Sequence, residues 1–167
     1  THSMLETVTH GLRTVEAGVS LAIKDSDKHV KLTDQAPLGS NFVAYADLTQ
    51  LPAVSYRGKS FVTLDRDSRV LSIVEKVPTG HLINTGLVGF ESSELFLSAL
   101  ENVSSESEPY VSDVLGRLIQ RGVSFEAVKA ATYEDWGTWE DWARYREGFA
   151  TFFVDLDGVV ARNENPL

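Results

Sequence analysis

Residues 60–90 have the sequence SFVTLDRDSRVLSIVEKVPTGHLINTGLVGF, and this stretch decides the fold. The apolar runs Ser60–Leu64 and Val70–Glu75 predict two strands, and Asp65–Ser68 between them is typical of a hairpin turn. A third strand is predicted over Leu82–Phe90. We therefore expect a segment of paired strands in the middle of the chain.

On either side of this segment, predicted helices alternate with predicted strands. Apolar residues at spacings of three and four predict a helix over Ser3–Val15, with Ser3 as its N-cap. Further elements are predicted as strands at Val19–Ile23, Phe42–Leu48, Ser124–Ala130 and Thr151–Asp155, as helices at Ser92–Leu100, Val111–Arg121 and Trp139–Glu147, and as loops at Asp34–Asn41 and Ser104–Pro109. This alternation predicts an α/β layered fold with a mixed sheet flanked by helices.

Composition excludes several classes of function. Hydrophobic residues make up 43% of the 167 residues and charged residues 23%, which is typical of a globular protein rather than a disordered one. The net charge is −9 and no Lys/Arg block occurs, so we expect no nucleic-acid binding. The chain has no cysteine, which excludes disulfides, zinc-thiolate sites and thiol catalysis.

Membrane association is not expected either. No apolar run approaches the roughly 20 residues that span a bilayer. No signal peptide opens the chain, so a cytoplasmic location is the default expectation.

Four short polar segments are candidates for a site. They are Lys24–Asp27, Val74–Lys76, Ile83–Gly86 and Glu134–Thr138. Each has a structural explanation when taken singly: a solvated turn, an exposed strand end, a bulge and a helix cap. Their order along the chain favours a functional interpretation.

That order resembles the sugar-1-phosphate nucleotidyltransferases. In that family, an apolar strand ending in Asp precedes a hairpin with Glu-Lys, then Asn-x-Gly in a strand, then an Asp before Gly-Thr. Thr1–Val8 resembles the helix before the metal-bearing strand, and Tyr110–Val114 resembles the family's Tyr-x-x-Asp segment. The resemblance spans Thr1–Tyr145 and implies a Rossmann-like nucleotidyltransferase fold of the glycosyltransferase-A type.

The resemblance also implies a reaction and a metal. A sugar-phosphate oxygen would attack the α-phosphorus of a nucleoside triphosphate, and pyrophosphate would leave. All the reacting groups are anionic, so Mg²⁺ is expected to neutralise charge. By resemblance its ligands are Asp27 and Asp135, with Asp25 as the alternative to Asp27 because the Asp-x-Asp pair leaves the register open.

Four residues are implied on the sugar side. Glu75 would accept hydrogen bonds from sugar hydroxyls, and Lys76 would pair with the sugar phosphate. Asn84 and Gly86 would border the sugar pocket, where a glycine allows close approach of the backbone. Lys76 joins Asp27 and Asp135 as a catalytic candidate.

The chain departs from the family in two places. Val77 separates Glu-Lys from Pro78, whereas the family has Pro directly after Glu-Lys. The family's glycine-rich triphosphate loop is also missing, because the residues before Asp25 include Gly11 and Gly18 but no glycine-rich cluster. We therefore expect residues 1–148 to be an incomplete nucleotidyltransferase domain that does not turn over alone. An unpaired sheet edge would then favour a homodimer.

The end of the chain resembles a second family. Phe152–Val160 is similar to the opening strand of haloacid-dehalogenase-like phosphatases, in which the first Asp is the nucleophile and the second the acid/base. Asp155 and Asp157 hold those positions here, but the later motifs of that family cannot fit before Leu167. Residues 149–167 are thus interpreted as the start of a phosphatase-like domain without a working site. The alternatives are a non-catalytic sugar-phosphate-binding or assembly module, or a domain that regulates a phosphatase.

Overall fold

The computed structural model describes residues 4–51, 56–100 and 110–149. These residues form two compact units, one that ends at Asp135 and one that begins at Trp136. In chain order the elements are α1 (Met4–Leu12), β1 (Leu21–Lys24), β2 (Lys28–Leu32), β3 (Phe42–Asp47), the short 3₁₀ helix η1 (Leu48–Gln50), β4 (Ser60–Leu64), β5 (Val70–Glu75), β6 (Leu82–Phe90), α2 (Ser93–Leu100), α3 (Val111–Gln120), β7 (Glu126–Asp135) and α4 (Trp139–Glu147).

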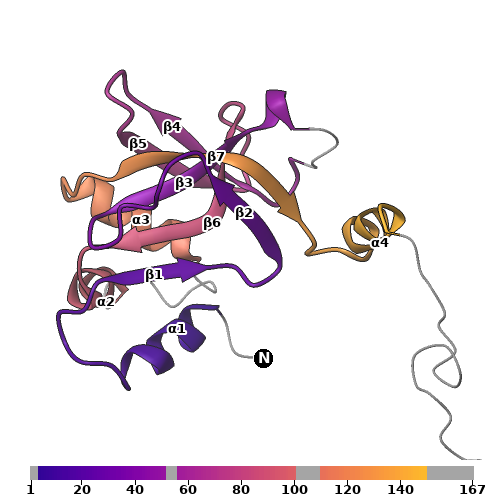
Figure 1. Cartoon of the computed structure of the whole chain (residues 1–167). Coiled ribbons are helices and arrows are strands. Elements are labelled where there is room, and N and C mark those ends of the chain that lie inside the picture. Colours follow the sequence, from indigo (N-terminus) through magenta and orange to yellow (C-terminus); the bar gives the residue numbers. More distant parts are fainter. Residues whose placement is uncertain (1–3, 52–55, 101–109, 150–167) are drawn as a thin grey trace, which may run out of the picture. The chain divides into compact units, whose positions relative to one another are not determined.

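Within the described residues, seven strands form one mixed sheet (Figure 1). The strand order is β2-β7-β3-β6-β4-β5, and β1 pairs with the C-terminal half of β6. β3 and β7 run parallel, whereas the other pairs are antiparallel. The predicted α/β fold with a mixed sheet is confirmed.

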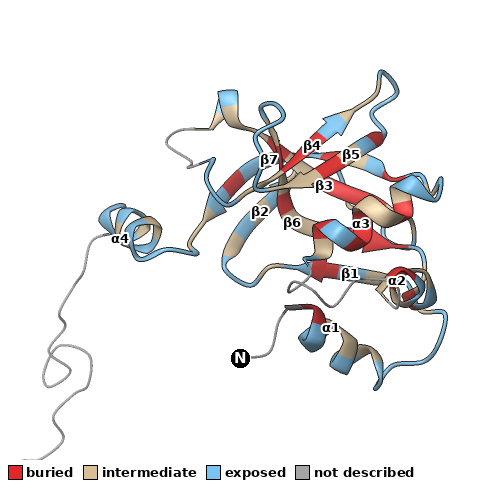
Figure 2. Ribbon diagram, turned by 180° about the vertical axis from the view of Figure 1, so that it is seen from behind, coloured by how far each residue is buried: buried red, intermediate tan, exposed pale blue. Residues whose placement is uncertain are grey.

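Two hydrophobic clusters fix the helices and the sheet in place. The larger cluster joins α1, α2 and α3 to the sheet, with Phe90, Phe96 and Phe125 in edge-to-face contact at its centre. The smaller one contains Phe61 and Ile83. Phe61 belongs to the smaller cluster and its neighbour Val62 to the larger, so the two clusters lie on opposite faces of β4. Buried residues accordingly concentrate in the central strands and in α3 (Figure 2).

Local sequence signals account for many of the boundaries. β4, β5 and β6 have the predicted bounds. The Ser92 hydroxyl accepts the Leu95 N–H at 3.2 Å and caps α2, as predicted. After α3 the chain turns at Gly122, whose φ of +87° favours glycine.

The sequence prediction was incomplete at two strands. No strand was predicted at β2, which pairs with β7 at the end of the sheet order. β7 was expected to end at Ala130 but continues to Asp135, because β2 pairs with this extension. The predicted cap Ser3, loop Ser104–Pro109 and strand Thr151–Asp155 lie outside the described residues.

The unit that begins at Trp136 contains α4. The Thr138 hydroxyl accepts the Asp141 N–H at 3.1 Å at the start of this helix, and Gly148 ends it as predicted. No residue of α4 is buried. Its aromatic side chains contact one another instead: the Trp142 and Tyr145 rings stack with their centroids 5.5 Å apart, and the Phe149 ring follows 4.8 Å from Tyr145.

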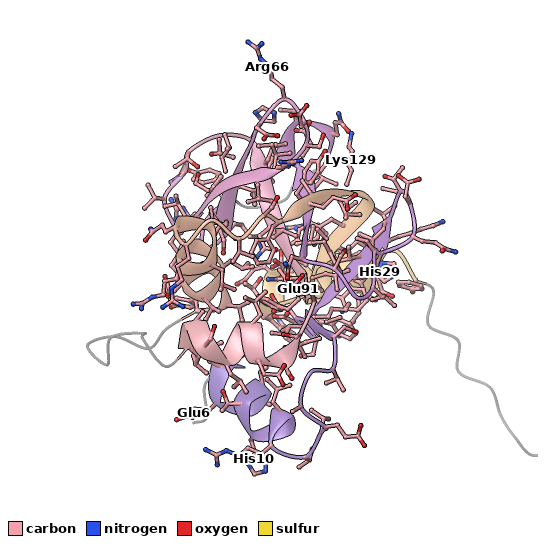
Figure 3. The ribbon with its side chains drawn as sticks, turned by 90° about the vertical axis from the view of Figure 1, so that its left-hand side faces the viewer. Glu6, His10, His29, Arg66, Glu91 and Lys129 are labelled. Atoms are coloured by element: carbon pink, nitrogen blue, oxygen red, sulfur yellow. The ribbon has the colours of Figure 1, made fainter. Side chains whose placement is uncertain are left out.

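Charged side chains are spread over the first unit. Arg66 extends from the tip of the β4–β5 turn, whereas His10 lies at the opposite end on α1 (Figure 3). Lys129 interacts with Gln50 at 3.0 Å. These three residues therefore do not form one basic face.

Candidate functional site

A pocket of about 220 Å³ lies where β1, β4, β5 and β6 meet the start of α3. It is lined by Asp25, Glu75, Lys76, Asn84 and Gly86, among others. The structure thus brings together five of the residues that the sequence singled out. They come from three separate segments of the chain.

Gly86 allows β6 to approach Asp25 closely. The register of β3 against β6 shifts between Val43 and Tyr45, and the resulting bulge in β6 contains Gly86. Gly86 has a φ of +78°, and its carbonyl accepts the Asp25 N–H at 2.9 Å. A Cβ at this position would lie only 2.2 Å from Asp25 Oδ2. A glycine is therefore required by both the backbone angle and the adjacent carboxylate.

Neighbouring side chains hold the bulge in shape. Asn84 Oδ1 accepts the Gly86 N–H at 3.0 Å. Thr85 is fully buried, and its hydroxyl donates to the Ala44 carbonyl at 3.0 Å. These bonds satisfy polar groups that the shifted register would otherwise leave unpaired.

Glu75 is oriented by two hydroxyls from different elements. Glu75 Oε2 accepts hydrogen bonds from Ser60 at the start of β4 and from Ser112 in the first turn of α3, the latter at 2.6 Å. Ser112 is buried. The two donors fix the carboxylate at the wall of the pocket, where it can accept hydroxyls of a ligand.

Lys76 follows β5 with its backbone in the left-handed region, at a φ of +58°. Such a backbone costs a residue with a Cβ about 1–2 kcal/mol, and strain of this kind concentrates at functional sites. The Lys76 ammonium donates to the Tyr110 hydroxyl and lies 4.1 Å from the centroid of that ring. The hydrogen bond with Tyr110 raises the pKa of Lys76, so the side chain is a cation at neutral pH.

The candidate metal ligands occupy different surroundings. Asp25 lines the pocket and forms an ion pair with Lys28, while Asp135, at the end of β7, forms one with Lys59. Their side chains are 13% and 10% exposed. Asp27 is exposed in the turn between β1 and β2. Among the described residues that line the pocket, neither Asp27 nor Asp135 is present.

Lys28 links the two partly buried carboxylates. It lies directly opposite Asp135 across β2 and β7, so the two side chains share a face with their Cβ atoms about 5 Å apart. Its ammonium group contacts Asp25. Asp25 and Asp135 therefore flank Lys28, which itself lines the pocket.

These two carboxylates fit the needs of Mg²⁺ in donor type. Within the described residues, no group of three or more His, Cys, Asp or Glu side chains is placed to hold a metal ion. Mg²⁺ typically takes one or two carboxylates and completes its shell with water and substrate phosphates. Asp25 and Asp135 supply carboxylate oxygens of the type that Mg²⁺ prefers.

Several lining residues were not found by sequence reasoning. They are Lys28, Lys59, Ser60 and Ser112. Lys28 follows the Asp-x-Asp pair directly, and Ser112 lies within the Tyr-x-x-Asp segment at Tyr110–Val114, so both were near a recognised signal. Lys59 stands in no motif, and only the pairing of β4 with β5 places it beside Lys76. Asp155 and Asp157 lie outside the described residues.

Comparison with solved structures identifies the fold. The nucleoside-diphosphate-sugar pyrophosphorylase from Vibrio cholerae RC9 superposes with a TM-score of 0.71 at 18% identity, covering 88% of this chain and 66% of that one. The inositol-1-phosphate CTP transferase from T. maritima gives 0.65 at 13%, covering 89% and 64%. The chain has a nucleotidyltransferase fold.

A UDP-glucose pyrophosphorylase complexed with UDP-glucose also matches, with a TM-score of 0.62 at 14% identity over 87% of this chain and 62% of that one. The chain spans about two thirds or less of the length of these structures. No family model and no curated protein matches the sequence. Within the described residues, no helix is long and apolar enough to cross a membrane.

Proposed function

We propose that this chain supplies the sugar-phosphate side of a nucleotidyltransferase. The enzyme would transfer a nucleotidyl group from a nucleoside triphosphate to a sugar phosphate, release pyrophosphate and so make a nucleotide-sugar. The observation that supports this is the meeting of Asp25, Glu75, Lys76, Asn84 and Gly86 in one pocket of a nucleotidyltransferase fold.

The proposed role of each residue follows from its charge. The Lys76 ammonium would pair with the sugar phosphate, and Glu75, oriented by Ser60 and Ser112, would accept sugar hydroxyls. Asp25 and Asp135 would hold Mg²⁺. The family resemblance assigns Asp27 in the place of Asp25. Bound Mg²⁺ supplies neutralisation of the charge that develops on the transferred phosphoryl group.

The test is the phosphate dependence of binding. Lys76→Ala removes a charge-assisted contact to the sugar phosphate, so affinity for a sugar 1-phosphate should fall roughly tenfold. Affinity for the same sugar without its phosphate should change little. Calorimetry on a panel of both ligand types measures this, with Lys31→Ala as the control because Lys31 is exposed on β2 and does not line the pocket. Equal losses for both ligand types would count against the role of Lys76.

A second candidate is a sugar-phosphate-binding module without catalysis. The observation in its favour is that both partly buried carboxylates are already neutralised by lysines. A module of this kind would bind the sugar phosphate equally well with and without Mg²⁺. A nucleotidyltransferase site should respond to the metal, so the same calorimetry repeated with and without Mg²⁺ separates the two.

A further inference from the structure

Three lysines face one pocket, and the proposed function uses only one of them. Lys28, Lys59 and Lys76 all line the cavity. Lys28 and Lys59 are ion-paired with Asp25 and Asp135, the two carboxylates suited to a divalent cation.

On the basis of the proposed function, we propose that Lys28 and Lys59 are exchangeable counter-ions that become a phosphate site when a divalent cation takes Asp25 and Asp135. The ligand class of this site is a phosphate oxyanion of the nucleotide or of pyrophosphate. It is distinct from the sugar phosphate assigned to Lys76.

The ion pairs are placed for such an exchange. The side chains of Lys28 and Lys59 are only 19% and 12% exposed, so both are largely shielded from solvent. Lys59 is further held near Tyr133, with its Nζ 5.7 Å from the ring centroid, and the Tyr133 hydroxyl donates to Asp135 Oδ2 at 3.0 Å. Both pairs are therefore partly buried, where charges interact more strongly than at the surface.

Charge balance explains why the two ligands should cooperate. A divalent cation at Asp25 and Asp135 competes with the two ammonium groups for the same oxygens. A partly buried ammonium that loses its carboxylate is costly, and a phosphate in the pocket would replace the lost counter-ion. Cation and phosphate should therefore strengthen each other's binding, and the coupling must be equal in both directions.

A purely structural role for the two pairs predicts the opposite result. If Lys28 and Lys59 only stabilise the fold, their removal should leave metal affinity unchanged or lower it through loss of structure. Under the exchange, removal of a competing ammonium should increase metal affinity.

The first experiment is titration of the chain with Mg²⁺ alone. Lys28→Gln and Lys59→Gln should each bind Mg²⁺ about tenfold more tightly than the unmodified chain. The reason is that an ammonium in contact with a carboxylate changes the affinity of that carboxylate for another cation by about tenfold or more. Lys31→Gln is the matched control, since it changes the net charge equally but lies outside the pocket, and it should stay within about twofold. If neither pocket variant exceeds this control, the exchange is wrong.

The second experiment uses only the unmodified chain, so it does not depend on whether a variant folds. Inorganic phosphate should bind the unmodified chain about tenfold more tightly at saturating Mg²⁺ than without it, a coupling of roughly the size usual between linked sites. Equal phosphate affinity under the two conditions would overturn the proposal. The sugar 1-phosphate titration of Lys76→Ala remains an independent readout. If Lys76→Ala binds the sugar 1-phosphate as tightly as the unmodified chain does, while the lysine variants bind Mg²⁺ more tightly, the sugar-phosphate function is rejected and the exchange is retained.

Discussion

Gly86 is the residue on which the geometry of the pocket depends most directly. Gly86→Ala places a methyl group against Asp25 Oδ2 and forces alanine to a φ of +78°. The backbone term alone costs about 1–2 kcal/mol, and displacement of Asp25 should add about 1 kcal/mol or more. Urea denaturation measures the loss of unfolding free energy, and calorimetry with Mg²⁺ reports the displaced carboxylate.

Gly39→Ala is the matched control for this substitution. Gly39 also has a positive φ, +93°, but a Cβ there would meet nothing within 4 Å. It should therefore show the backbone cost only. In an Asp25→Ala background, which removes Oδ2 and Cγ but leaves a Cβ 3.1 Å from the new methyl, the cost of Gly86→Ala should fall toward the control value. A cost that does not fall at all in that background would show that the Asp25 carboxylate is not the source.

Sequence reasoning at this scale identified residue types better than contacts. Glu75, Lys76, Asn84 and Gly86 were singled out because each lies in a short recognisable segment, and all line one pocket. The Asp-x-Asp pair could not be resolved, because the choice between Asp25 and Asp27 depends on where β1 ends and how far its pairing with β6 continues. The structure places Asp25 against Gly86 and leaves Asp27 exposed, while their metal-binding roles stay predictions.

At the scale of elements, strands that contain buried apolar residues were easier to predict than β2, which lies at the end of the strand order. β4, β5 and β6 each carry buried apolar residues and were placed with their observed bounds. β2 has only partly buried and exposed residues, so its sequence resembles a loop. Its pairing with β7 is long-range and leaves little local signal. β2, which was not predicted, also carries Lys28, and for this reason the Lys28–Asp25 ion pair was not anticipated.

The contrast between α2 and α4 gives a prediction at this scale. α4 is nine residues long and has no buried residue, so its helical state rests largely on its cap. Thr138→Ala removes that cap, worth about 1 kcal/mol, and should unfold much of α4 without shifting the unfolding midpoint of the sheet. Circular dichroism follows the sheet and the helices together, whereas tryptophan fluorescence reports α4 and its entry alone, because the chain's 3 tryptophans are Trp136, Trp139 and Trp142.

Ser92→Ala supplies the comparison. It removes the cap of α2, whose Phe96 and Ala99 are packed in the core. This loss should lower the global free energy of unfolding by about 1 kcal/mol and leave tryptophan fluorescence of the folded protein unchanged. A Thr138→Ala protein with intact fluorescence and helicity would mean that contacts among the aromatic side chains suffice to hold α4.

For the whole molecule, the prediction concerns turnover. Phosphoryl transfer depends on positioning and charge stabilisation at every phosphate, and this polypeptide has no glycine-rich cluster before Asp25. Loss of one positioned charge typically costs about 10²–10³ in rate. We therefore expect the 167-residue chain alone to release no measurable pyrophosphate from a panel of nucleoside triphosphates and sugar 1-phosphates with Mg²⁺. Clear release of pyrophosphate would mean that another segment of this chain binds the triphosphate.

The tip of the β4–β5 hairpin makes these measurements accessible to spectroscopy. Arg66 is exposed there, and the paired strands place it about 20 Å from Glu75 at the other end of the hairpin. The chain contains no cysteine, so Arg66→Cys would create a single thiol for attachment of a fluorophore. Energy transfer from that dye to a labelled nucleotide or sugar phosphate would report ligand arrival in real time, with the attachment point outside the pocket lining.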